Sequence, residues 1–361
     1  MPLSTSISVL LCRPSKPDSI IDALRLAHSC LNQHGFTDVF EVDSTDFHAN
    51  LMTALQSSKN STILLIDVMT TTKLDLRTLP THCLEPRPLL SYENKPSSLK
   101  EAVTVGMQDD GLCRVLSDLE RSRWADCFRL EKAILLPRET LRTALFEGAE
   151  LDTLLSSFLK QPFRGIAMPR RIEKFEHLKP CLFLDRDGII IHDRGYVHKI
   201  EDLELVPHIE DLIRWARAQG FHIIVVSNQS GVARGKFSKQ NLNSFTEHLH
   251  SLLKAKEAEP DAWYYCPFYE NGSVPEFSLP SVSRKPSPGL LLHAAENFPI
   301  DFTKSLMIGD TSSDQILLEG LYTLFLEGVH PLDRSLLKVF SSHRELVSHL
   351  SELYAEPPSK A

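Results

Sequence analysis

The chain has 361 residues, of which 42% are hydrophobic and 24% are charged, an ordinary globular composition that is long enough for two domains. The net charge of −8, without a long run of Lys or Arg, excludes an obvious nucleic-acid-binding surface. Apolar runs fall short of the ~20 residues that span a bilayer, and the seven cysteines never form a C-x-x-C pair. We therefore expect a cytoplasmic protein with free thiols and with neither nucleic acid nor membrane as a partner.

The first half alternates strand and helix patterns, which favours an α/β domain. A helix is predicted near residues 20–31, where Ile20, Leu24, Ala27 and Leu31 share one face. A second helical stretch is expected near 115–123, and residues 70–100 read as irregular because they are rich in Pro, Thr, Ser and Lys. The strands predicted in this half are 7–12, 38–42, 63–66 and 133–136.

A polar segment bracketed by prolines, residues 161–180, predicts a boundary near residue 175. The two domains are therefore expected at 1–175 and 176–361. In the second, an apolar strand ends directly before Asp185, and strands at 221–226 and 305–308 enclose helical patterns. This order predicts a Rossmann-like doubly wound parallel sheet, beside an N-terminal α/β domain. Ser342 and Glu345 predict a capping box for a closing helix.

Glycines are unevenly placed along the chain: ten of the 15 follow residue 175, and none precedes Gly35. Glycine is needed where the backbone turns with positive φ or approaches a ligand phosphate closely. We therefore expect the chemistry in the second half. The first half lacks the glycine-rich phosphate loop that would follow its first strand.

Four short motifs occur in order in the second half, each at the end of a predicted strand or the start of a helical segment. Any one of them alone is a common turn sequence, but together they indicate a site. They are Asp185-Arg186-Asp187-Gly188, Ser227-Asn228-Gln229-Ser230-Gly231, Arg284-Lys285-Pro286 and Gly309-Asp310-Thr311-Ser312-Ser313-Asp314.

This set of residue types fits phosphoryl transfer. A carboxylate such as Asp185 can attack phosphorus and form an aspartyl-phosphate, provided that nearby positive charge offsets the meeting of two anions. Asp185 and Asp310 supply the oxygen ligands that Mg²⁺ prefers. Asp187 can protonate the leaving group and then activate water. Lys285 offers a positive charge and Ser227 a hydroxyl to the phosphoryl oxygens.

The four motifs resemble those of the haloacid dehalogenase superfamily of phosphatases, over roughly residues 180–330. The resemblance implies a capless fold with Asp185 as nucleophile and Asp187 as acid/base. It also implies that Ser227 and Lys285 bind phosphate and that Mg²⁺ is held by Asp185, Asp310 and Asp187, the last through its backbone carbonyl. Asp314 would hold the metal or Lys285.

Further sequence segments outside these four motifs are similar to those of the D-glycero-D-manno-heptose 1,7-bisphosphate phosphatases and the related histidinol-phosphate phosphatases. They are GYV at 195–197, VVSNQSGVARG at 225–235, YYCP at 264–267 and SRKPSPGLL at 283–291. This likeness implies a small phosphorylated sugar or another phosphomonoester as substrate. It makes Asn228, Gln229, Ser230 and Arg284 the candidate substrate-binding residues.

The sequence also departs from that group. Relatives carry four Cys and His ligands of a zinc site, of which only Cys266 remains, so we expect no structural zinc. Thr311 stands where the heptose enzymes tend to have lysine, which leaves the substrate open. A non-catalytic binding protein with a vestigial phosphatase domain is the alternative from another class, but the complete set of motif residues argues against it.

The first half shows a fainter likeness. The strand 64–67, which ends at Asp67, and the segment 133–141 loosely resemble sugar nucleotidyltransferases. The missing glycine-rich loop removes the backbone N–H groups that would bind a pyrophosphate. We therefore keep two interpretations: a degenerate nucleotidyltransferase-like domain, or another α/β accessory domain.

Overall fold

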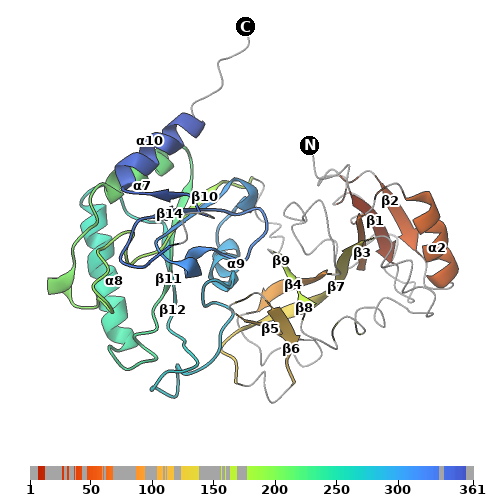
Figure 1. Ribbon diagram of the computed structural model, residues 1–361, viewed down its shortest axis with the longest axis horizontal. Helices are drawn as coiled ribbons and strands as arrows, with labels where there is room; N and C mark the ends of the chain where they lie inside the picture. Colours follow the sequence, from red (N-terminus) through yellow and green to blue (C-terminus); the bar gives the residue numbers. More distant parts are fainter. Residues whose placement is uncertain are drawn as a thin grey trace, which may run out of the picture. The chain divides into compact units, whose positions relative to one another are not determined.

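A computed structural model of the chain divides into two units, residues 1–174 with 318–320, and residues 175–317 with 321–361 (Figure 1). The structure describes 177–332 and 337–354 of the second unit. In the first half it describes separate stretches and a few single residues: 7–12, 27, 31, 36, 38–42, 47–58, 60, 62–67, 87–93, 104–108, 110, 112–117, 123–137, 156, 159 and 163–168.

The N-terminal unit is built on a mixed sheet in the order β2-β1-β3-β7-β5-β6-β8, with β4 paired to β7 and β9. β1 is parallel to β2 and β3, whereas β7 runs antiparallel to β3, β4 and β5. Helix α2 (Phe47–Ser57) packs against β2. The strands are β1 (Ile7–Cys12), β2 (Val39–Val42), β3 (Thr62–Asp67), β4 (Arg87–Glu93), β5 (Thr104–Met107), β6 (Leu112–Val115), β7 (Cys127–Pro137), β8 (Phe163–Arg164) and β9 (Ile166–Met168).

The expected strands β1, β2, β3 and β7 are present, but two other expectations for this half were wrong. Val115 ends strand β6 rather than starting a helix, although residues 118–122 of the predicted helical stretch lie outside the described residues. β4 occupies 87–93 of the segment read as irregular. Strands β5, β8 and β9 were not predicted. Short strands that complete a sheet carry little periodic signal of their own, because their pairing partners are far away in sequence. Of the predicted helix near 20–31, only Ala27 and Leu31 are described, and both are helical and buried.

The C-terminal unit contains a six-stranded, all-parallel sheet in the order β12-β11-β10-β13-β14-β15. β10 and β13 lie at its centre and are buried along their whole length, which explains their unbroken apolar sequences. The doubly wound parallel sheet predicted for this domain is confirmed. Its strands are β10 (Cys181–Leu184), β11 (His222–Asn228), β12 (Ala262–Cys266), β13 (Leu306–Gly309), β14 (Tyr322–Leu326) and β15 (Val339–Phe340).

Helices cover both faces of this sheet. α7 (Ile209–Ala218), α8 (Lys239–Lys254) and α10 (His343–Tyr354) pack on one face, and α9 (Gly289–Ala295) lies on the other (Figure 1). Leu184 and Val225 of the sheet meet Phe245 of α8 and Leu346 of α10 in one buried cluster. The remaining elements are the 3₁₀ turns η5 (Ile200–Asp202), η6 (Phe302–Lys304) and η7 (Ser312–Asp314).

At the start of α10 the capping box is only half formed: the Glu345 N–H donates to the Ser342 hydroxyl, but the Glu345 carboxylate accepts from Ser341 instead. Among all helices in the described part of the chain, none combines the length and apolar character that crossing a bilayer requires.

Candidate phosphoryl-transfer site

The carboxyl ends of β10, β11 and β13 meet at one edge of the sheet, and each is followed by one of the predicted motifs. Register places Leu184 opposite both Val225 and Ile308, and β13 runs one residue and β11 three residues beyond that level. The remaining motif, Arg284-Lys285-Pro286, reaches this edge from the turn before α9. Asp185, Asp187, Lys285 and Asp310 therefore line one cavity of about 650 Å³.

The buried ammonium of Lys285 lies between two carboxylates. Its Nζ is 2.9 Å from Oδ1 of Asp185 and 2.5 Å from Oδ1 of Asp314. Burial works to lower the pKa of Lys285, but the two carboxylates outweigh it and raise that pKa well above its usual value. Burial raises the pKa of Asp185 to about 6, against the lowering effect of Lys285. Lys285 therefore stays charged beside Asp185 near neutral pH.

The second oxygen of Asp314 is also fully used. It accepts hydrogen bonds from the backbone N–H groups of Asp310 and Thr311 and from the Thr311 hydroxyl, at 3.2, 3.0 and 2.9 Å. Gly309 makes room for this arrangement, because a Cβ there would lie 2.1 Å from the Cβ of Asp314. Of the two roles expected for Asp314, its contacts match that of holding Lys285.

The carboxylate of Asp310 differs from that of Asp314 in its hydrogen bonding: both of its oxygens are buried and neither has a hydrogen-bond partner. Burial, followed by the charges of Asp185 and Asp314, raises the pKa of Asp310 to about 8. Oxygens of these three aspartates lie within 4.8 Å of one another. A buried carboxylate without a partner is costly, and a hard divalent cation would satisfy it, so the residues present fit Mg²⁺.

Two glycines leave space around Asp310. A Cβ at Gly188, which has φ of +80°, would come within 2.0 Å of Oδ2 of Asp310, and one at Gly328 would come within 2.4 Å. Gly188 belongs to the first motif. Gly328 follows β14 and was not singled out by the sequence, because a lone glycine after a strand has no distinguishing pattern.

Asp187 is held by side chains of the motifs themselves. The Arg186 guanidinium donates to both of its carboxylate oxygens, with Nη2 2.8 and 2.9 Å away, and to the carbonyl of Val197. Gln229 Nε2 lies 2.9 Å from Oδ2 of Asp187 and 2.9 Å from the Ser227 hydroxyl. Arg186 is completely buried. Arg186 was assigned no role from sequence, because the D-x-D-G pattern leaves the residue between its two aspartates unspecified.

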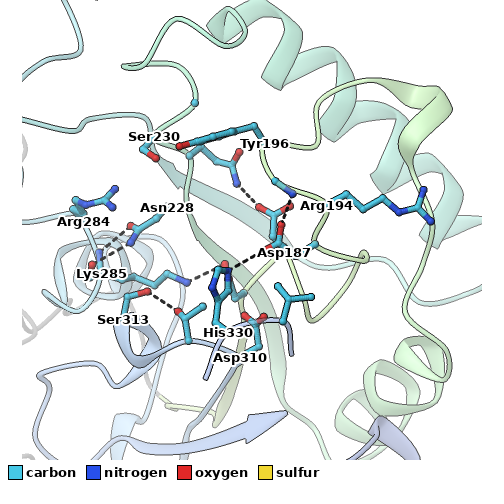
Figure 2. A pocket seen from close by; sticks show the side chains of 17 residues that line it. Asp187, Arg194, Tyr196, Asn228, Ser230, Arg284, Lys285, Asp310, Ser313 and His330 are labelled. Carbon is cyan, nitrogen blue, oxygen red and sulfur yellow. Dashed lines mark hydrogen bonds and ion pairs between the residues drawn. The ribbon is translucent and has the colours of Figure 1, made fainter. Parts of the chain in front are cut away.

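The residues expected to bind substrate divide into two kinds. The Asn228 side chain forms two 3.0 Å hydrogen bonds with the backbone N–H and carbonyl of Lys285, and the Gln229 amide contacts Asp187. These side chains therefore support other site residues. All four residues line the cavity, and Ser230 and Arg284 are labelled beside Asn228 and Lys285 in Figure 2.

The rim of the cavity includes residues that the sequence analysis did not select. Two loops supply them, one after β10 and one after β14: Asp193, Arg194, Tyr196, Val329 and His330. The two loops meet where Nε2 of His330 lies 3.1 Å from Oδ2 of Asp193. The segment 195–197, in the loop after β10, resembles the heptose bisphosphate phosphatases in sequence. Residues 327–331 carried no such signal.

Comparison with known proteins agrees with this geometry. The family model described as polynucleotide kinase 3 phosphatase matches residues 181–331. The D-glycero-beta-D-manno-heptose-1,7-bisphosphate 7-phosphatase of Escherichia coli is 43% identical over 135 residues, which cover 37% of this chain and 71% of that protein. The chain belongs to the haloacid dehalogenase-like phosphatase family that includes this enzyme, and it is a phosphoric monoester hydrolase. Membership of this family, which the sequence motifs predicted, is thus confirmed.

Two solved structures give weaker matches. D,D-heptose 1,7-bisphosphate phosphatase from B. bronchiseptica, complexed with magnesium and phosphate, is 22% identical with a TM-score of 0.41, covering 48% of this chain and 99% of that chain. For the N-terminal region, the match is a CMP:2-keto-3-deoxy-manno-octonic acid synthetase complexed with CTP. Its identity is 10% and its TM-score 0.32, with 45% of this chain and 90% of that chain covered. Values of this size support no functional conclusion.

Proposed function

We propose that the C-terminal domain hydrolyses a small sugar bisphosphate, of the heptose 1,7-bisphosphate type, with Mg²⁺ as cofactor. One observation carries the proposal: Asp185 lines the cavity 2.9 Å from the Lys285 ammonium, with an oxygen of the unpartnered Asp310 carboxylate within 4.8 Å. The identity with the Escherichia coli heptose bisphosphate phosphatase supports the substrate class.

In the proposed reaction, an oxygen of Asp185 attacks the phosphorus atom and the bond to the sugar oxygen breaks. Asp187 gives its proton to the departing alkoxide. A water molecule then enters, Asp187 takes one of its protons, and the resulting hydroxide displaces Asp185 as inorganic phosphate forms. Ser227 and Lys285 donate hydrogen bonds to the phosphoryl oxygens in both steps, which offsets the charge that gathers there.

We assign the magnesium site to Asp185 and Asp310, with the backbone carbonyl of Asp187 as a third ligand. When bound, the ion would neutralise negative charge on the phosphoryl group. Asp314 is left out of this ligand set because both its oxygens already accept hydrogen bonds.

The proposal is tested by phosphate release from a panel of phosphoesters, with and without Mg²⁺. Heptose 1,7-bisphosphate is expected to have the highest kcat/KM. Histidinol phosphate represents the related activity, and a 3′-phosphorylated oligonucleotide is added because of the family model that matches 181–331. A clear preference for either of these, or no dependence on Mg²⁺, would reject the substrate or cofactor assignment.

A further inference from the structure

Two arginine side chains meet one tyrosine ring beside the cavity. Cζ of Arg234 lies 4.0 Å from the centre of the Tyr269 ring, and Cζ of Arg284 lies 4.9 Å from the same point. Both distances are within the range of cation–π contacts. Arg284 lines the cavity next to Lys285. The ring of Tyr269, which is not a cavity residue, therefore contacts a cation that is.

Neither arginine is neutralised by the described part of the chain. Nε of Arg234 and Nη1 of Arg284 are buried without a hydrogen-bond partner, and neither guanidinium forms an ion pair with a described carboxylate. Each arginine as a whole is only partly buried, but a buried N–H without a partner is unfavourable, and a guanidinium is well suited to bind phosphate or carboxylate oxygens. This pair of arginines thus lacks an anion that a substrate could supply.

The backbone of the 267–283 loop fixes where the tyrosine ring lies. The Tyr269 N–H donates to Phe277, 3.1 Å away, and the Tyr269 carbonyl accepts from Gly272 at 3.0 Å. The N–H groups of Ser273 and Val274 both donate to the carbonyl of Ala233, at 2.7 and 2.9 Å. Ala233 directly precedes Arg234, so the loop is attached to the turn that carries the first arginine.

That turn also reaches the cavity. The Arg234 N–H donates to the carbonyl of Ser230, 2.9 Å away, and Ser230 lines the cavity. The loop therefore joins the Ser230–Arg234 turn to Arg284 through a single aromatic ring. A long arginine side chain that is already held in place loses less conformational freedom when it binds an anion.

We propose that Tyr269 is a positioning residue that holds Arg284 and Arg234 ready for a second anionic group of the substrate, at the edge of the cavity formed by Ser230. This inference rests on the proposed bisphosphate activity. It adds to it a specificity role for Tyr269 and Arg234, whereas the reacting phosphoryl group is contacted by other residues.

The test compares kcat and KM for heptose 1,7-bisphosphate and for p-nitrophenyl phosphate, which has no second anion. Tyr269→Leu is expected to raise KM for the bisphosphate about fivefold, the size of one cation–π contact, and to leave kcat and the p-nitrophenyl phosphate constants within about twofold. Tyr269→Phe keeps the ring and is expected to behave as wild type. Arg234→Gln is expected to reproduce the Tyr269→Leu effect if the leucine variant does not fold.

Tyr264→Leu is the matched control, since that half-buried ring on β12 contacts His293 and does not line the cavity. An equal loss on both substrates, or the same loss in the control, would overturn the inference. If wild type prefers the bisphosphate and Tyr269→Leu keeps that preference, only the inference fails. If wild type has no such preference, the bisphosphate proposal fails and the role of Tyr269 fails with it.

Discussion

Nζ of Lys285 lies 2.5 Å from Oδ1 of Asp314, and both side chains are buried at the base of the cavity. The Lys285 ammonium also contacts Asp185, so it forms ion pairs with two carboxylates at once. With Asp310 nearby, three carboxylates share one lysine, an excess of negative charge that a divalent cation would offset. Asp314 therefore connects the phosphate-binding lysine to the loop that carries Asp310.

Replacing this connecting carboxylate is expected to affect stability as well as turnover. Asp314→Asn removes the negative charge opposite Lys285 and replaces one hydrogen-bond-accepting oxygen by an NH2 group. We therefore expect the unfolding free energy to fall by about 3–5 kcal/mol, the usual cost of breaking a buried ion pair. Urea denaturation measures this. A loss below about 1 kcal/mol would contradict the importance of the pair.

The hydrogen bonds to Asp187 lead to a prediction about Gln229. Gln229→Leu removes the donor to both Asp187 and Ser227, so we expect kcat to fall about tenfold, the value of one to two lost hydrogen bonds. Gln219→Leu, at an exposed position after α7, is the matched control and should be silent. An unchanged kcat in Gln229→Leu would show that Arg186 alone orients Asp187.

Gly328 should matter for the metal rather than for the fold. A methyl group there would press on Oδ2 of Asp310 from 2.4 Å, so Gly328→Ala is expected to raise the Mg²⁺ concentration for half-maximal activity about tenfold, which corresponds to about 1.4 kcal/mol. The comparison is Gly220→Ala, where φ is +80° but no atom lies within 4 Å. That control should cost stability and leave the magnesium dependence unchanged.

His343, the first residue of α10, should make stability depend on pH. It is completely buried, and burial lowers its pKa to about 4. The unfolded chain binds a proton near pH 6.5, whereas the folded protein does so only near 4, so unfolding becomes easier as pH falls between these values. The expected loss is about 3 kcal/mol at the lower end. His343→Phe should flatten this part of the stability profile in thermal denaturation, and an unchanged profile would contradict the assignment.

Much of the C-terminal domain could be predicted from its sequence because its chemistry follows short, fully buried strands. Continuous apolar runs before Asp185 and Asp310 identified β10 and β13, and the parallel arrangement brings their carboxyl ends to one edge. The side-chain partners could not be predicted. Asn228 looks like a substrate ligand in sequence, and only the fold brings its amide to the backbone of Lys285, 57 residues away.

The N-terminal domain was harder for a physical reason. Its sheet is mixed, and β4 pairs both antiparallel with β7 and parallel with β9. Pairings between distant short strands leave no local periodicity, so β4, β5, β6, β8 and β9 were missed, whereas β1 and β3 were recognised from their apolar runs. Asp67 ends β3 as expected, but its side chain lies outside the described residues.

Asp185 is expected to form the covalent bond to phosphorus, and its replacement by asparagine provides the decisive comparison. Release of inorganic phosphate from heptose 1,7-bisphosphate with Mg²⁺ should be measured for wild type and for Asp185→Asn, with circular dichroism to verify that the variant is folded. We expect one phosphate released per substrate molecule by wild type and none above background by a folded Asp185→Asn. Equal release by both proteins, or no release by wild type from any phosphoester offered, would contradict it.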